Sequence, residues 1–238
     1  SHQLRNLAQN LAAGIIQAIN DISVVTPFSL ACAALLTYPR KGVYRRELLQ
    51  IIQVFHDYLQ TRSVRRADSL ENLTPAVEET LTLCEARKLI TPIEKEEGLT
   101  DELGLGGYSI DEAKRPLLEY YKNNVLHFFI PLSFIATSIL AQKEDLVALY
   151  RIIEDYKFLK RLFRNEFIFE DKKDDLEEVN SMLAYMLEQK MIKDIDLEGE
   201  TCIEIRSRGR TRLTRSRSAR LGRGNRRALR ACHRCAAR

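Results

Sequence analysis

The sequence has few of the residues on which most catalytic and metal sites depend: it contains only four His and five Cys. The five Cys are an odd number without a framework spacing, and no signal-peptide pattern is found. These two features predict a reducing compartment. Cys232 and Cys235 have a zinc-like spacing, but a structural zinc site needs four ligands and no second pair follows. The sequence therefore predicts no metal site.

The motifs of other common chemistries are missing as well. We find no Gly-rich phosphate loop, nucleophile elbow or pair of catalytic carboxylates. His56 and Asp57 are neighbours in sequence and cannot face each other on a helix, so we interpret His56 as a partly exposed structural residue. His127 lies among aromatic residues and is interpreted as a satisfied core or interface His. We therefore predict no catalytic, cofactor-binding or metal-binding residue in this chain.

Charge is divided unevenly along the chain. Residues 206–238 contain 13 Arg and neither Lys nor an acidic residue, whereas residues 1–205 contain 24 basic and all 33 acidic residues. The acidic body argues against a nucleic-acid-binding domain. The tail has too few apolar residues to bury a core and is predicted to be disordered. It is either an Arg-rich arm that binds RNA or acidic lipid, or the product of out-of-frame translation, which the absence of Lys favours.

Two long apolar runs organise the body of the chain. The longest, Val125–Leu140, has sixteen residues, fewer than the eighteen or more typical of a membrane-crossing helix. It belongs to a helix that we expect to begin near Pro116 and to bend at Pro131. This helix is either a buried central helix or an interfacial helix that touches a membrane. The other run, Ile22–Leu36, contains Thr26-Pro27, which predicts a short buried helix from Phe28.

Hydrophobic periodicity predicts the remaining elements. The predicted helices cover 4–19, 43–59 and 144–163, and two more begin at Thr74-Pro75 and at Asp174 or Asp175. In the last two helices of the chain we expect inward-facing side chains that include Leu146, Tyr150 and Leu176. The predicted strands cover 89–93, 108–110, 191–195 and 201–205, with a turn at 38–42 and a charged, Gly-rich loop at 94–107.

A weak internal repeat relates two parts of the chain at an offset of 102 residues. Val77, Lys88 and Ile90 match Val179, Lys190 and Ile192, so that in each copy a helix ends in a basic residue and a hairpin follows. That is the outline of a winged-helix unit. The acidic residues on these helices favour packing or protein contact over DNA binding. We predict a mostly α fold, a helical bundle with two small winged-helix-like β-hairpins and a disordered Arg-rich tail.

Two sequence blocks resemble a known enzyme family. Tyr120–Phe129, with the sequence YYKNNVLHFF, resembles a block in the C-terminal part of bacterial (PlsB-type) glycerol-3-phosphate 1-O-acyltransferases. Ile19–Leu30, with the sequence INDISVVTPFSL, is similar to the block that follows the catalytic domain in those enzymes. The resemblance covers roughly residues 9–205. With the resemblance we predict a C-terminal helical region at 1–205, which the internal repeat divides into two winged-helix-like halves at about 37–142 and 143–205, and a tail at 206–238.

The resemblance also implies which parts of the enzyme are absent. These enzymes use a His-x-x-x-x-Asp pair, with the His as general base. In such a pair an Asp follows the His by five positions. None of the four His of this chain has an Asp there, so the catalytic pair is missing; the residues at these positions are Leu7, Thr61, Leu132 and Arg238. Because the chain also begins with Ser1 in a helical composition, we interpret it as the non-catalytic C-terminal part of a longer protein. Whether the chain itself counts as an enzyme is left open.

The function implied by the resemblance is acyl transfer from acyl-CoA or acyl-carrier protein to glycerol 3-phosphate, in phospholipid synthesis at the cytoplasmic face of the cell membrane. It implies no metal or bound cofactor. The expected partners are the missing catalytic domain and, through peripheral contact, the membrane. We expect the two apolar runs to cover that domain, line the acyl path or touch the bilayer. The alternative is a non-enzymatic winged-helix-like interaction module with a basic nucleic-acid-binding arm.

Overall fold

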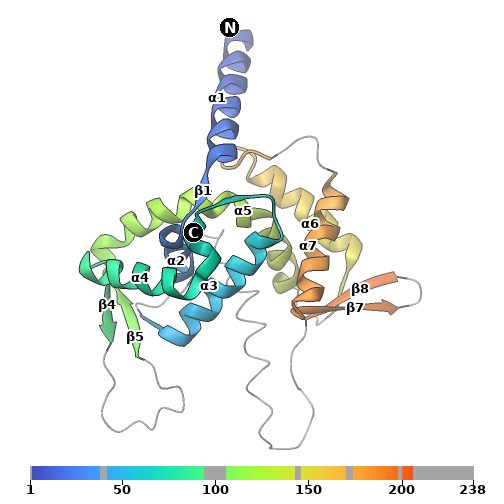
Figure 1. Cartoon of the computed structure of the whole chain (residues 1–238). Coiled ribbons are helices and arrows are strands. Elements are labelled where there is room, and N and C mark those ends of the chain that lie inside the picture. Colours follow the sequence, from blue (N-terminus) through green and yellow to red (C-terminus); the bar gives the residue numbers. More distant parts are fainter. Residues whose placement is uncertain are drawn as a thin grey trace, which may run out of the picture.

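The computed structural model describes residues 2–37, 42–93, 106–142, 146–169, 174–197 and 200–205. Most of the turn predicted at 38–42, most of the loop at 94–107 and the tail at 206–238 lie outside these ranges. Within them the fold is mostly α, as predicted. The α-helices are α1 His2–Ile22, α2 Pro27–Leu36, α3 Arg45–Gln60, α4 Leu73–Ala86, α5 Arg115–Ala141, α6 Leu149–Leu162 and α7 Asp175–Glu188 (Figure 1).

The core is built around α2 and α5, which contain the two apolar runs. Thr26 caps α2 as the sequence predicts: its hydroxyl accepts a hydrogen bond from the Ser29 backbone N–H, Ser29 caps the Thr26 N–H in return, and Pro27 follows. The side chains from Leu30 to Leu35 are inaccessible to solvent. The two helices pack against each other, with the rings of Phe28 and Tyr121 centred 4.6 Å apart.

Helix α5 is therefore the buried central helix of the two alternatives. Residues 112–141 are long and apolar enough to cross a membrane, yet 61% of the apolar window is buried inside the molecule. The helix continues through Pro131 without interruption. Most of each run is covered by the other and by α3, α4, α6 and α7, whereas Ile22 and Val24 are exposed. Contact of the two runs with a partner domain, an acyl path or the bilayer stays a prediction.

Aromatic side chains join α3, α5 and α7 at the centre of the molecule. Phe55, Tyr58 and Phe129 are fully buried, and the ring centroid of Phe129 lies 4.6 Å from that of Phe55 and 5.7 Å from that of Tyr58. The Tyr58 hydroxyl donates to the Phe128 carbonyl at 3.0 Å. The Tyr185 hydroxyl on α7 donates to the Val54 carbonyl on α3 at 3.2 Å. These bonds satisfy polar atoms that burial would otherwise destabilise.

The same order of elements occurs twice. The first set is β2 Gly42–Tyr44, α3, α4 and the hairpin β4 Ile90–Ile93 and β5 Gly107–Ile110; the second is β6 Leu146–Ala148, α6, α7 and the hairpin β7 Ile192–Leu197 and β8 Glu200–Ile205. The sheet orders correspond, β2-β5-β4 and β6-β8-β7. Lys88 and Lys190, which are 102 positions apart, both have φ 55° directly after a helix. The prediction of both hairpins is thus confirmed, and the boundaries at about 37–142 and 143–205 stay a prediction.

The opening strand of each set was not predicted. Val43 and Tyr44 belong to β2, and α6 begins only at Leu149, because Leu146–Ala148 forms β6. Three residues are too few to show an alternating pattern. The orientation of α6 and α7 was predicted only in part: Tyr156 and Val179, which belong to the predicted hydrophobic pattern, face the core, and so does Ile152, which does not belong to it. Three side chains expected inside are 38%, 60% and 43% exposed: Leu146, Tyr150 and Leu176.

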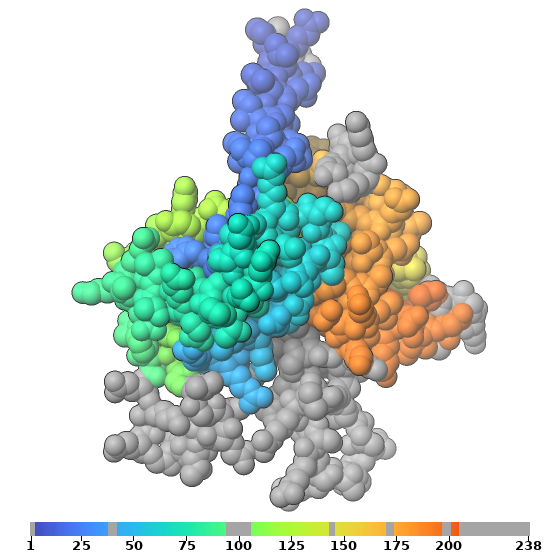
Figure 2. All heavy atoms as spheres, viewed as in Figure 1, coloured from blue at the N-terminus to red at the C-terminus, as the bar shows by residue number. Residues whose placement is uncertain are grey.

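Helix α1 projects away from the body (Figures 1 and 2). It is connected to the body through β1 Val24–Val25, which pairs in parallel with β3 Arg65–Arg66. A 3-10 turn at Asp68–Asn72 then leads into α4, and another at Glu112–Lys114 into α5. Along one side of α1 runs an apolar stripe whose members are 53–67% exposed: Leu4, Leu7, Leu11, Ile15, Ile19 and Ile22. We call this set the α1 stripe.

Candidate functional site

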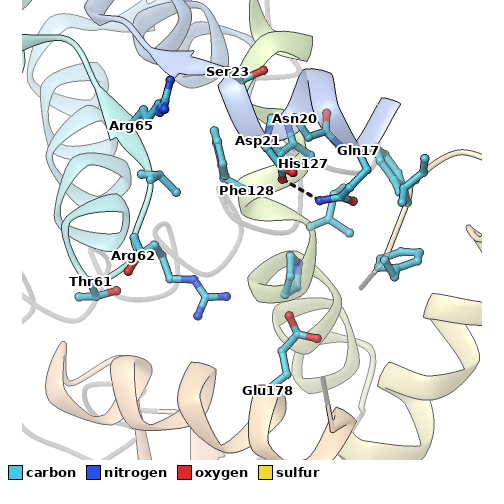
Figure 3. Close-up of a pocket in the computed structure, with 17 residues that line it drawn as sticks. Gln17, Asn20, Asp21, Ser23, Thr61, Arg62, Arg65, His127, Phe128 and Glu178 are labelled. Carbon is cyan, nitrogen blue, oxygen red and sulfur yellow. Dashed lines mark hydrogen bonds between the residues drawn. The ribbon is translucent and has the colours of Figure 1, made fainter. Parts of the chain in front are cut away.

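The two blocks that carry the family resemblance meet at one cavity. Its volume is about 540 Å³, and the first block contributes Asn20, Asp21 and Ser23 while the second contributes His127 and Phe128 (Figure 3). More than a hundred positions separate these groups in sequence. The cavity is the candidate functional site because residues of both blocks line it.

Five parts of the fold form the walls of the cavity. The end of α1 supplies polar side chains, the connection from α3 to β3 supplies two Arg, the middle of α5 supplies His127, the chain after α6 supplies apolar side chains, and α7 supplies an acid. The residues are Gln17, Asn20, Asp21, Ser23, Thr61, Arg62, Ser63, Val64, Arg65, His127, Phe128, Ile130, Pro131, Phe167, Ile168, Phe169 and Glu178.

His127 is the least satisfied polar group in this wall. Its Nε2 atom is buried and has no hydrogen-bond partner among the residues that the structure describes. The prediction of a satisfied core or interface His is therefore wrong. Burial lowers the pKa of His127 to about 4, and the charge of nearby Asp21 opposes this shift only in part. The Asp21 carboxylate accepts a hydrogen bond from the Gln17 amide at 2.8 Å. At neutral pH the His127 ring is thus uncharged and can serve as a hydrogen-bonding group.

The lowered pKa of His127 makes stability depend on pH. In the unfolded chain the ring takes up a proton near pH 6.5, whereas in the folded protein it does so only near pH 4. The unfolded state therefore binds more protons in this window, and folding stability falls as the pH decreases through it. Between pH 7.5 and 4.5, allowing for partial exposure of the ring, we expect the free energy of unfolding of the wild type to fall by about 1–2 kcal/mol more than that of His127→Phe. Urea unfolding at both pH values checks this, and equal losses would contradict it.

Arg62 and Arg65 provide the positive charge of the cavity. Neither forms an ion pair with a carboxylate in the described parts of the chain, although the Arg62 guanidinium lies 5.6 Å from the centroid of the Tyr58 ring. On the facing helix, Glu178 accepts a hydrogen bond from the Tyr156 hydroxyl at 2.7 Å and lies 3.8 Å from the Lys160 ammonium. Burial and the bond to Glu178 raise the pKa of Tyr156 far above its usual range, so it stays a donor.

His56 lies outside the cavity and has a structural role. It is buried, not partly exposed as predicted, and its Nε2 lies 3.1 Å from the Leu70 carbonyl. That contact requires the proton on Nε2. His56 Nδ1 lies 3.6 Å from Asp57 Oδ1, which is too long for a hydrogen bond, as the positions of the two neighbours on the helix led us to expect. The contact with Leu70 connects α3 to the turn before α4.

The described residues offer no metal cluster: no three His, Cys, Asp or Glu side chains come together in them. Cys232 and Cys235 lie outside the described ranges, so the prediction of no metal site stays a prediction. Cys32, Cys84 and Cys202 are free and buried. Burial raises the pKa of Cys84 to about 11 and that of Cys32 further, so both thiols stay protonated and unreactive.

The helices that precede the two hairpins lack the basic surface of a DNA-recognition helix. On α4, Glu78 pairs with Arg45, and Glu79 is exposed. On α7 the first turn contains Asp175, Glu177 and Glu178. Phosphate contacts would require Lys or Arg at such positions. The arrangement therefore does not favour the nucleic-acid alternative within the described residues.

Sequence comparisons identify similar proteins. Residues 1–237 match the family described as the C-terminal region of glycerol-3-phosphate acyltransferase. A glycerol-3-phosphate acyltransferase from Aeromonas hydrophila is 29% identical over 191 residues, and one from Hamiltonella defensa is 25% identical over 194 residues. These matches cover 78% and 81% of this chain. The chain spans only about 22% of the length of either relative.

Proposed function

The chain belongs to the family of glycerol-3-phosphate acyltransferase C-terminal regions, and from this premise we propose that it is a non-catalytic scaffold that docks onto the acyltransferase part of a longer protein. The whole protein would transfer an acyl group from acyl-CoA or acyl-carrier protein to glycerol 3-phosphate. We further propose that it works at the cytoplasmic face of the cell membrane.

The exposed α1 stripe is the observation that carries the docking proposal. Its six Leu and Ile side chains lie on one side of a helix that projects from the body (Figure 2). An exposed contiguous apolar patch of this kind is typical of an interaction surface. The other side of α1 carries amides such as Gln9 and Gln17, so only one side of the helix can bury apolar area in a partner.

The charge of α1 favours a protein partner over a lipid surface. Between His2 and Ile22 the helix contains one Arg, one Asp and no Lys. Helices that lie on membranes usually have many basic residues on their polar side, which attract anionic head groups. Helix-in-groove contacts between proteins depend instead on apolar anchors spaced along one side. The spacing of Leu4, Leu7, Leu11 and Ile15 fits that second pattern.

The absence of a catalytic pair from this sequence supports the non-catalytic part of the proposal. The direct test is an acyl-transfer assay with acyl-CoA and glycerol 3-phosphate, using the purified chain and a chimera in which the chain replaces the matching segment of the Aeromonas hydrophila relative. We expect turnover from the chimera and none from the chain alone. Turnover by the chain alone would refute the non-catalytic role, and an inactive chimera would contradict the scaffold role.

Disrupting the α1 stripe is expected to weaken docking. In the chimera, Leu11→Asp combined with Ile15→Asp should lower kcat/KM about tenfold, which corresponds to about 1.4 kcal/mol, because two carboxylates would enter an apolar interface. The matched control is Gln9→Asp with Ala13→Asp, which places the same charges four residues apart on the opposite side of α1. Equal activity of the two variants would argue against docking through the stripe.

A further inference from the structure

The cavity combines a positively charged side with an apolar side. Arg62 and Arg65 come from the connection between α3 and β3, whereas Phe167, Ile168 and Phe169 come from the chain after α6. Both segments line the same cavity, and Figure 3 labels Arg62 and Arg65 in its wall. A ligand that fills the space between them would contact cations at one end and hydrocarbon at the other.

Arg62, which is half-buried, and Arg65, which is exposed, line the cavity and form no ion pair with an acid among the described residues. In the described residues several cations are paired with carboxylates, among them Arg45, Arg115, Arg151, Lys160 and Lys193. No such pair includes Arg62 or Arg65. A guanidinium in a recess without a carboxylate partner is suited to bind a phosphate or carboxylate through paired N–H donors.

The acids in the cavity wall do not cancel this charge. Glu178 is already hydrogen-bonded to Tyr156 and lies near the ammonium of Lys160, which itself contacts Asp175 at 2.6 Å. Asp21 is held by the Gln17 amide at the end of α1. Arg62 and Arg65 therefore retain the charge that attracts an anion, and His127 contributes a polar atom that still lacks a partner among the described residues.

We propose that this cavity binds an amphiphile with one anionic head group and a single short apolar chain. The head group lies on the side of the cavity that Arg62 and Arg65 line, and the chain lies against Phe167, Ile168 and Phe169. The volume of about 540 Å³ falls within the roughly 300–1,000 Å³ typical of small-molecule sites. The inference stands on the cavity alone and does not depend on docking through the α1 stripe.

Calorimetric titration of the full chain tests the inference. The probes are decyl phosphate, butyl phosphate, decanoate and decanol, each used below its aggregation concentration. We expect decyl phosphate or decanoate to bind at least tenfold more tightly than both decanol and butyl phosphate, because only they present an anion and a long chain together. Whichever of decyl phosphate and decanoate binds more tightly identifies the preferred head group as a phosphate or a carboxylate. Binding of decanol equal to that of both anions would overturn the inference, as would no detectable binding of either anion.

Variants assign each end of the ligand to its side of the cavity. Arg62→Gln and Arg65→Gln should each weaken the tighter anion about tenfold, whereas Arg46→Gln, an exposed Arg on α3 outside the cavity, should leave its affinity unchanged. Ile168→Ser should reduce the ratio of decyl to butyl phosphate affinity. The double variant Leu11→Asp with Ile15→Asp should bind as wild type does, which excludes adsorption to the α1 stripe. Unchanged binding in both Arg variants at the cavity would refute the assignment.

Discussion

Replacing Phe129 with Ala is expected to lower the free energy of unfolding by about 3–5 kcal/mol, the usual cost of removing a buried aromatic ring. Phe129 has no solvent-exposed surface and lies on α5, between Phe55 and Tyr58 of α3. The next residue toward the N-terminus, Phe128, accepts the hydrogen bond of the Tyr58 hydroxyl. Loss of the ring therefore leaves a cavity and loosens the contact that orders α3 against α5.

Urea unfolding followed by circular dichroism measures this effect. The matched control is Phe158→Ala on α6, where the side chain is 54% exposed and we expect a change within about 0.5 kcal/mol. A loss below about 1.5 kcal/mol for Phe129→Ala would show that the site collapses around the missing ring, contrary to close packing of α2, α3 and α5.

Replacing Lys160 with Met is expected to cost about 2–3 kcal/mol, somewhat less than the loss of a partner from a fully buried ion pair. The Lys160 ammonium lies 2.6 Å from Asp175 Oδ1 and 3.8 Å from Glu178 Oε2. The side chains of Lys160 and Glu178 are only 16% and 12% exposed. Without the cation, two carboxylates on the first turn of α7 would face each other with less hydration than in solution.

The control for Lys160 is Lys157→Met, one turn earlier on α6, where the side chain is exposed and forms no ion pair among the described residues. We expect a change of about 0.5 kcal/mol or less there. Adding Asp175→Asn to Lys160→Met should restore part of the lost stability, because it removes one of the uncompensated charges. A double variant less stable than Lys160→Met alone would contradict this electrostatic explanation.

Local chemistry made several elements predictable. Thr26-Pro27 specifies the start of α2 through a capping box and a Pro at the first helical position, and Asp174 caps α7 by accepting from the Leu176 N–H at 3.2 Å. The offset of 102 residues pointed to two similar helix–hairpin sets, and Lys88 and Lys190 share an unusual backbone conformation. The two capping signals lie within a few residues, which is the range that sequence patterns describe well, whereas the repeat was found by matching residue types at a fixed offset.

Features that depend on contacts between segments distant in sequence could not be predicted. Periodicity showed that α1 has an apolar side, but the sequence alone could not show that α2 would be covered by α5 while the α1 stripe stayed exposed. The cavity could not be predicted from the sequence for the same reason. Its lining residues come together only in the folded chain, among them Asp21, Arg62, His127 and Glu178. The one available signal was that Asn20, Asp21 and His127 occur within the two blocks that resemble the family.

The projection of α1 from the body has a thermodynamic consequence. Most helical stability in proteins comes from tertiary packing, and this helix of 21 residues has few contacts with the rest of the described chain, so it depends on intrinsic propensity. Gly14 in its middle weakens it by about 1 kcal/mol relative to Ala. The ordering of α1 is therefore coupled to whatever covers it. Association through this helix should show the large negative heat-capacity change of coupled folding and binding, with affinity reduced by the entropy of ordering.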